Sequence, residues 1–218
     1  MKYQHILFDL DGTLTNPAIG ITSSVMYALK KFGVEPPDRS ELYCCIGPPL
    51  VNSFKELWGF DDEKAWLAVE YYREYFGDKG IFENEVYEGI PELLAALKAV
   101  GKKVYLATSK PEEYAVEILK HFDLYKYFDF IAANTMAEDR ATKKEVIDYL
   151  KSSIPEVNSD NAVMVGDTVF DAEGARLSQL DSVCVLYGFG KKDELLAAGA
   201  GRVAESVCEL RKILLEEQ

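Results

Sequence analysis

The stretch from Tyr3 to Leu14, YQHILFDLDGTL, decides the fold of this chain. A short, largely apolar run ends at Phe8 and is followed at once by Asp9, Asp11 and Gly12, which predicts a buried strand that ends in a turn. Two acids in such a turn could be a plain polar turn, half of a calcium loop or a chemical site. The further Asp or Asn and the Glu of a full calcium loop do not follow, which weighs against calcium.

The segment that follows this strand changes to a helical pattern. Apolar residues recur at helical spacing from about residue 16 to residue 84, with helix stops at Gly33 and Gly59. Asp38 with Glu41 resembles a capping box, and Pro49 can open a further helix. No strand pattern interrupts the block, so we expect a small helical bundle.

After Tyr87 the pattern alternates between strands and helices. Strands are expected at 103–107, 128–132, 162–165 and 182–186, and helices at 91–100, 111–122, 142–151, 170–177 and 206–216. This alternation predicts an α/β fold: a Rossmann-like, three-layer core with a mainly parallel sheet. The first strand belongs to that sheet, so the predicted core is 1–15 with 87–218, and the helical domain 16–86 is an insertion after the first strand.

Polar residues follow several predicted strands, where ligands bind in an open parallel sheet. They are Asp9 and Asp11, then Thr108-Ser109-Lys110, then Lys143 at a helix start, and finally Gly166-Asp167 with Asp171. Each fragment also has an ordinary structural explanation as a helix cap, a surface lysine or a tight turn. Their joint appearance at the strand ends of one sheet favours a phosphoryl-transfer site.

The residue types suggest distinct roles. Asp9, ionised at neutral pH by its reference pKa of about 3.9, could attack phosphorus without a base. A divalent cation would reduce its repulsion from phosphate, and Mg²⁺ prefers oxygen ligands, here the carboxylates of Asp9 and Asp167 and the backbone carbonyl of Asp11. The Asp11 side chain could protonate the leaving oxygen and later accept a proton from water.

The remaining predicted site residues contact phosphate or support the site. Thr108 could hydrogen-bond a phosphoryl oxygen, and Lys143 would add positive charge where negative charge accumulates. Asp171 would orient the metal's ligands or hold Lys143. We expect Gly12, Thr13 and Ser109 to complete the phosphate-binding set.

Composition and charge exclude several other classes of function. The chain has 24 Lys and Arg against 37 Asp and Glu, a formal charge of −13, so it lacks the basic field needed for a nucleic acid polymer or an anionic membrane surface. No apolar run approaches the roughly 18–20 residues that span a bilayer. Four cysteines without a Cys-x-x-Cys pair indicate reduced thiols, and we predict a cytoplasmic protein.

The motifs together resemble the haloacid dehalogenase superfamily over essentially the whole chain. Its four motifs are similar to Asp9-Leu10-Asp11-Gly12-Thr13-Leu14, Thr108, Lys143, and Gly166-Asp167 with Asp171. The resemblance implies that Asp9 forms an aspartyl-phosphate, that Asp11 is the acid/base, that Asp9, Asp11 and Asp167 bind magnesium, and that 16–86 is a helical cap.

A narrower resemblance comes from residues 46–50 and 82–87, which are similar to phosphatases of the phosphoglycolate phosphatase type, including a 5′-nucleotidase-like group. The resulting hypothesis is Mg²⁺-dependent hydrolysis of a small phosphorylated metabolite by a monomeric enzyme. Two alternatives stay open from the residues: a phosphomutase that uses the same intermediate, and a non-hydrolytic phospho-Asp signalling module. A receiver module is much shorter than this chain, which counts against the second.

Overall fold

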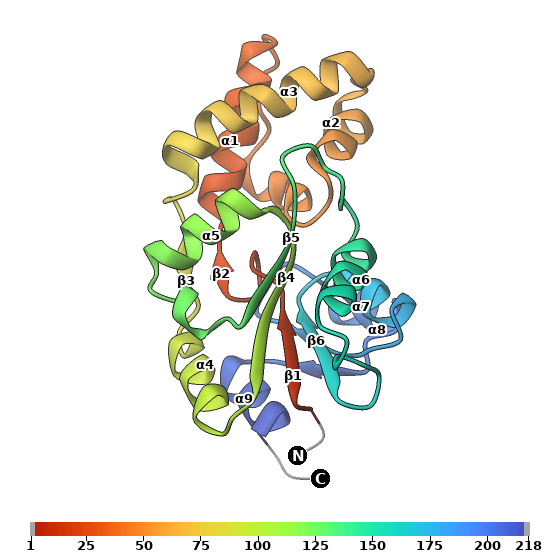
Figure 1. Cartoon of the computed structure of the whole chain (residues 1–218). Coiled ribbons are helices and arrows are strands. Elements are labelled where there is room, and N and C mark those ends of the chain that lie inside the picture. Colours follow the sequence, from red (N-terminus) through yellow and green to blue (C-terminus); the bar gives the residue numbers. More distant parts are fainter. Residues whose placement is uncertain (1–2, 216–218) are drawn as a thin grey trace. The chain divides into compact units, whose positions relative to one another are not determined.

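The computed structural model describes residues 3–215, which form two compact units (Figure 1). The core unit consists of residues 3–16 and 86–215, and the insert unit is Pro17–Glu85. The chain enters the insert unit after the first strand of the core. Two short strands, β2 (Thr15–Asn16) and β3 (Glu85–Val86), pair with each other where the chain leaves and re-enters the core unit.

Within the described residues, the core unit contains a six-stranded sheet in the order β5-β4-β1-β6-β7-β8, and each neighbouring pair of strands is parallel. The strands are β1 (His5–Phe8), β4 (Lys103–Pro111), β5 (Phe130–Asn134), β6 (Ala162–Gly166), β7 (Asp181–Val185) and β8 (Arg202–Ala204). The expected α/β fold with a helical insertion is therefore confirmed.

Helices cover both faces of this sheet and make the core unit three-layered. In Figure 1, α4 (Ile90–Ala99), α5 (Glu112–His121) and α9 (Val207–Leu215) lie on one side of the sheet. On the other side lie α6 (Lys143–Ser153), α7 (Val169–Leu177) and α8 (Lys192–Ala197). Helix α6 packs on β4 and β5, and α7 packs on β6 and β7.

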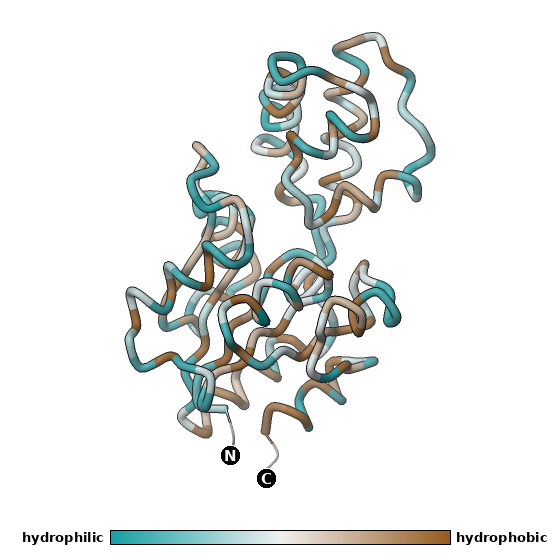
Figure 2. The backbone as a smooth tube through the Cα atoms, turned by 90° about the vertical axis from the view of Figure 1, so that its right-hand side faces the viewer, coloured by the Kyte–Doolittle hydropathy of each residue, from teal (hydrophilic) through white to brown (hydrophobic). Residues whose placement is uncertain are grey.

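The central strands are buried on both faces, as expected for a parallel sheet between helices. Every residue of β1 and of β6 is buried. A cluster that includes Leu7, Val146 and Met164 joins β1, α6 and β6. Hydrophobic and hydrophilic residues alternate along the coiled parts of the trace, as is typical of helices that pack one face on a sheet (Figure 2).

The strand order reverses direction beside β1. From β1 the chain proceeds to β4 and β5 on one side, and later to β6, β7 and β8 on the other. A crevice forms outside the carboxyl ends of the strands at such a switch point, which is where open α/β sheets bind ligands. The residues after β1 and β6 therefore occupy the favoured position for a site.

The insert unit is helical, as the sequence pattern predicts. It contains α1 (Ala18–Lys31), a 3₁₀ helix (Arg39–Cys45), α2 (Leu50–Trp58), α3 (Asp62–Tyr75) and a π-helical turn (Phe76–Gly80). The capping box of Asp38 and Glu41 is present, and Gly59 ends α2 with a left-handed φ of 64°. Buried aromatic rings, including Phe54 and Phe76, contribute to its core.

Several boundaries and two elements differ from the sequence-based expectation. Strand β4 extends to Pro111 rather than residue 107, because it resumes pairing with β5 after an irregularity. Strand β5 starts at Phe130, since Tyr125–Tyr127 forms a 3₁₀ helix before it. Strand β8 and helix α8 were not expected; both are short and glycine-flanked, which weakens any periodic signal. The last residue of the expected helix 206–216 lies outside the described residues.

Among residues 3–215, no helix is both long and apolar enough to cross a membrane.

We predict that Leu7→Ala lowers the free energy of unfolding by about 2–5 kcal/mol, because it opens a cavity in the middle of the sheet. Leu196→Ala in α8 is the matched control: this side chain is 49% exposed, whereas Leu7 is fully buried. The control should change the free energy by no more than about 0.5 kcal/mol. Urea unfolding of both variants measures the difference, and equal effects would contradict the assignment of β1 to the centre of the core.

Candidate active site

Lys143 lies at the centre of a buried charge cluster at the carboxyl ends of β1 and β6. Its Nζ is 2.8 Å from Asp9 Oδ1 and 2.9 Å from Asp171 Oδ1. The same ammonium donates a hydrogen bond to the backbone oxygen of Ala107 at 2.9 Å. Only 4% of the Lys143 side chain is exposed, so the ammonium is held by protein groups in place of bulk water.

The start of α6 fixes Lys143 in this position. Thr142 is the N-cap residue, and it forms a capping box with Glu145, so the helix begins with Lys143. Helix α7 passes very close to the lysine. A Cβ atom at Gly174 of α7 would lie 2.7 Å from Lys143 Cβ, so glycine there leaves room for the side chain.

Asp171 combines a structural and a site role. Its Oδ2 accepts hydrogen bonds from the backbone N of Thr168 at 3.0 Å and from Thr168 Oγ1 at 2.8 Å, which closes the capping box of α7. Its Oδ1 faces Lys143. Asp171 thus contacts the same ammonium as Asp9, and its expected effect on a metal or on Lys143 in the reaction stays a prediction.

Asp167, directly after β6, is held by two loops. The backbone N of Phe189 donates to its Oδ2 at 2.8 Å, and Thr13 Oγ1 donates to its Oδ1 at 3.3 Å. Thr13 is fully buried, so its hydroxyl serves Asp167, and the phosphate contact expected of Thr13 stays a prediction.

The glycines beside Asp167 are required by close approach. At Gly12, with φ +82°, a Cβ would lie 2.1 Å from Asp167 Oδ2; at Gly188 it would lie 2.4 Å from both Asp167 Cβ and the backbone oxygen of Gly12. Gly12 therefore makes space for Asp167, and its predicted phosphate contact stays untested. The loop with Gly188 and Phe189 was missed by the sequence analysis; the available signal was a Gly-Phe-Gly sequence soon after a buried strand.

The carboxylates of Asp9, Asp167 and Asp171 can jointly offer ligands to a metal ion. One oxygen of each lies within 4.8 Å of the others, and all three residues are buried. Three acids and one ammonium leave an excess of buried negative charge, and oxygen donors suit a hard divalent cation. The residues present therefore fit a metal, although the donor set by itself does not identify the element.

Burial alters the protonation of these groups. It raises the pKa of Asp9 to about 6, with Lys143 opposing the shift and Asp171 adding to it. Burial also raises the pKa of Asp167 well above its usual value, and the charges of Asp171 and Asp9 raise it further. Asp9 is thus less acidic than its reference value suggests, but the carboxylate remains the major form at neutral pH.

Lys143 stays protonated despite its burial. Burial by itself would lower the pKa of this ammonium, but the charges of Asp171 and Asp9 outweigh that effect and raise it above the ordinary value. The role expected of Lys143 toward a phosphoryl group stays a prediction.

Asp11 and the residues after Ala107 lie beside this cluster. The Asp11 carboxylate forms an ion pair with Lys110, a residue to which the sequence analysis gave no role. Thr108 is buried, and its Oγ1 accepts a hydrogen bond from the backbone N of Lys110 at 3.2 Å. Ser109 is partly exposed between them. This hydrogen bond links the Thr108 side chain to the backbone at the end of β4.

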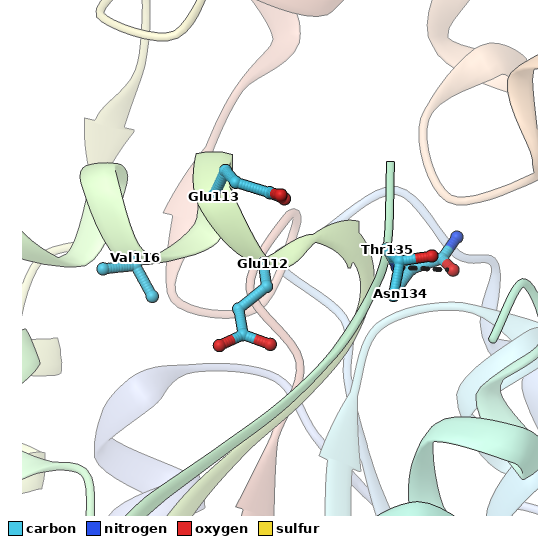
Figure 3. Close-up of a pocket in the computed structure, with 5 residues that line it drawn as sticks. All are labelled: Glu112, Glu113, Val116, Asn134 and Thr135. Atoms are coloured by element: carbon cyan, nitrogen blue, oxygen red, sulfur yellow. Dashed lines mark hydrogen bonds between the residues drawn. The ribbon is translucent and has the colours of Figure 1, made fainter. Parts of the chain in front are cut away.

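A pocket of about 450 Å³ lies where α5 begins and β5 ends (Figure 3). It is lined by Glu112, Glu113, Val116, Asn134 and Thr135, and the backbone N of Thr135 donates to Asn134 Oδ1 at 2.8 Å. None of these five residues belongs to the predicted site. Two glutamates without a cation among the lining residues make this pocket unfavourable for a phosphate.

Comparison with known proteins agrees with the fold. The family model described as haloacid dehalogenase-like hydrolase matches residues 6–185. A 5′-nucleotidase of Pseudomonas aeruginosa is 42% identical, over 98% of this chain and 96% of that protein. Tyrosine-protein kinase PtkA of Mycobacterium tuberculosis is 34% identical, over 97% of this chain and 72% of its own length.

A solved structure is similar throughout the fold. The crystal structure of a predicted phosphatase from Clostridium acetobutylicum has a TM-score of 0.95 and 47% identity, and the match covers 100% of both chains. The match with this structure therefore includes both the core unit, which carries the motifs, and the helical insertion. The chain therefore belongs to the haloacid dehalogenase-like hydrolases, and within them to the phosphatases.

Proposed function

We propose that this phosphatase hydrolyses small phosphomonoesters in a magnesium-dependent reaction, through an aspartyl-phosphate formed on Asp9. The observation that carries the proposal is the placement of Lys143 Nζ between Asp9 and Asp171, with Asp167 in the same buried cluster. A carboxylate at the end of β1 beside a fixed ammonium and further acids can attack phosphorus, and the cluster around it can stabilise the charge that develops.

In the first step, an oxygen of Asp9 forms a bond to phosphorus while the bond from phosphorus to the ester oxygen breaks. The leaving oxygen takes a proton from the Asp11 carboxyl group, so an alcohol departs and Asp11 becomes a carboxylate. Lys143 supplies positive charge beside the reacting carboxylate, and Thr108 offers a hydroxyl at the end of the neighbouring strand β4.

In the second step, water attacks the phosphorus of the aspartyl-phosphate. Asp11, now ionised, accepts a proton from the water, the bond between phosphorus and the Asp9 oxygen breaks, and inorganic phosphate leaves. The proton that Asp11 gave to the leaving oxygen is thereby replaced, and the Asp9 carboxylate is regenerated.

Magnesium would be held by Asp9, Asp167 and the backbone carbonyl of Asp11, with Asp171 holding Lys143 beside them. When bound, the ion would neutralise part of the charge of the phosphate and so permit a carboxylate to approach it. The hydrogen bonds from Phe189 and Thr13 support this role, because they orient the Asp167 carboxylate before any ion arrives.

Nucleoside monophosphates are the substrate class that we favour. The Pseudomonas aeruginosa relative named as a 5′-nucleotidase supports this choice. A screen of phosphate release from nucleoside 5′-monophosphates, phosphoglycolate and sugar phosphates, with Mg²⁺ and with EDTA, tests the class.

Asp9→Asn should lower the rate of phosphate release from the best substrate at least about 1000-fold, because an amide cannot act as the anionic nucleophile. The parent protein, quenched during turnover, should carry phosphate that hydroxylamine removes, as an acyl phosphate does; the variant should carry none. A variant that retains a tenth of the parent rate would rule out Asp9 as the nucleophile. Release of a phosphorylated isomer in place of inorganic phosphate would indicate a mutase.

Mg²⁺ should raise the thermal unfolding midpoint of the substrate-free protein, because a ligand that binds only the folded state stabilises it by mass action. Asp167→Asn should abolish this rise. Its midpoint without metal should equal or exceed that of the parent, since the substitution removes one of three buried like charges. Asp193→Asn, at an exposed position in α8, is the control and should keep the rise. An undiminished Mg²⁺ effect in Asp167→Asn would contradict the proposed metal site.

A further inference from the structure

Lys110 and Asp11 form an ion pair that is shielded from solvent. Lys110 Nζ contacts Asp11 Oδ2, and the two side chains are only 6% and 14% exposed. Holding a lysine and a carboxylate in one geometry costs side-chain entropy and desolvation. Because of this cost, we looked for a role of the Lys110–Asp11 pair in the function of the neighbouring cluster around Asp9.

An irregularity in β4 directs Lys110 toward Asp11. Strand β4 pairs with β5 in register up to Thr108 opposite Ala133, and pairing resumes with Pro111 opposite Asn134. Ser109 and Lys110 lie between these two pairs, outside the regular ladder. Bulges of this kind bend a strand and re-aim a side chain, and they are frequent next to active sites.

The two carboxylate oxygens of Asp11 have different surroundings. Oδ2 is bound by Lys110, whereas Oδ1 is buried and has no hydrogen-bond partner among the described residues. A carboxyl group with one oxygen fixed in this way cannot rotate freely. Its other oxygen is left to exchange a proton with a group outside the protein.

We propose that Lys110 is a positioning residue for Asp11: it holds Oδ2 so that Oδ1 is the atom that gives a proton to the leaving oxygen. This inference rests on the proposed function, in which Asp11 is the acid of the first step. During that step the proton passes from Asp11 Oδ1 to the ester oxygen as the bond to phosphorus breaks. Oδ2 keeps its bond to Lys110 throughout, so no further reactant is needed.

The leaving group provides the test, because an alkoxide needs a proton and p-nitrophenolate does not. The values of kcat/KM for p-nitrophenyl phosphate and for a nucleoside 5′-monophosphate both report the steps up to departure of the leaving group. In Lys110→Met, kcat/KM for the nucleotide should fall about tenfold or more beyond any fall for the aryl phosphate, within the range that general acids contribute. Asp11→Asn should show the same selective loss.

Equal losses for both substrates in Lys110→Met would overturn the proposal, since they would mean that the lysine binds the phosphoryl group or only supports the fold. The double variant Asp11→Asn, Lys110→Met removes both charges and so avoids an unpaired buried carboxylate. Its selective loss should equal that of Asp11→Asn alone, because the lysine acts through Asp11. A further selective loss in the double variant would contradict this coupling.

Two controls separate this inference from the proposed function. Lys98→Met removes a different lysine–aspartate pair of the core unit, that of Lys98 with Asp129, and should leave the ratio of the two kcat/KM values unchanged. Asp9→Asn should abolish the hydrolysis of both substrates. If Asp9→Asn remains active, the proposed function fails; if it is inactive and Lys110→Met shows no selectivity, only the role of Lys110 fails.

Discussion

The contact of the Lys143 ammonium with Asp9 and Asp171 is the interaction on which the rest of the site depends. Taking these charges out of water is costly, and removing one partner of such a buried group typically costs about 3–5 kcal/mol. The protein meets the cost with further polar contacts: the backbone oxygen of Ala107 accepts from the lysine, and Thr168 donates to Asp171. Even so, an excess of negative charge remains. Burial raises the pKa values of Asp9 and Asp167, and the neighbouring carboxylates raise them further. A fold selected for stability alone would not collect three acids there. The same excess of negative charge makes the cluster of Asp9, Asp167 and Asp171 suitable for binding a cation.

Several residues of the site also build the elements that carry them. The capping box of Thr142 and Glu145 starts α6 at Lys143, and that of Thr168 and Asp171 starts α7. Because one carboxylate both caps a helix and faces the lysine, the position of the charge is as rigid as the helix end. Glycines contribute by being small: side chains at Gly12 and Gly188 would overlap with Asp167. Preorganisation of this kind means that little has to be rearranged as charge develops during the reaction.

Much of the fold could be predicted, and the reason is periodicity. Buried runs such as 162–165 and helices such as that ending at Gly59 carry signals that local spacing and capping express directly. The additional strand β8 and helix α8 are too short for such signals. The loop with Gly188 and Phe189 was missed because its contribution is a backbone N–H, which every residue except proline possesses. The bulge after Thr108 was missed because it depends on the register with β5, a property of two strands rather than of one segment.

The sequence by itself determined the alternation that forms a parallel sheet, the helical insertion after the first strand, and the set of acids, hydroxyl and lysine at the strand ends. These follow from local patterns. The parallel direction of the strands brings their carboxyl ends to one edge of the sheet, and the reversal of strand order at β1 opens the crevice there. Only the tertiary structure decided which charges touch: Lys143 meets Asp9 and Asp171, while Lys110 meets Asp11. Such pairings depend on distances of a few ångströms between residues about 30 to 130 positions apart. Burial likewise belongs to the assembled core, and it is burial that shifts the pKa of Asp9 away from the value of an isolated side chain.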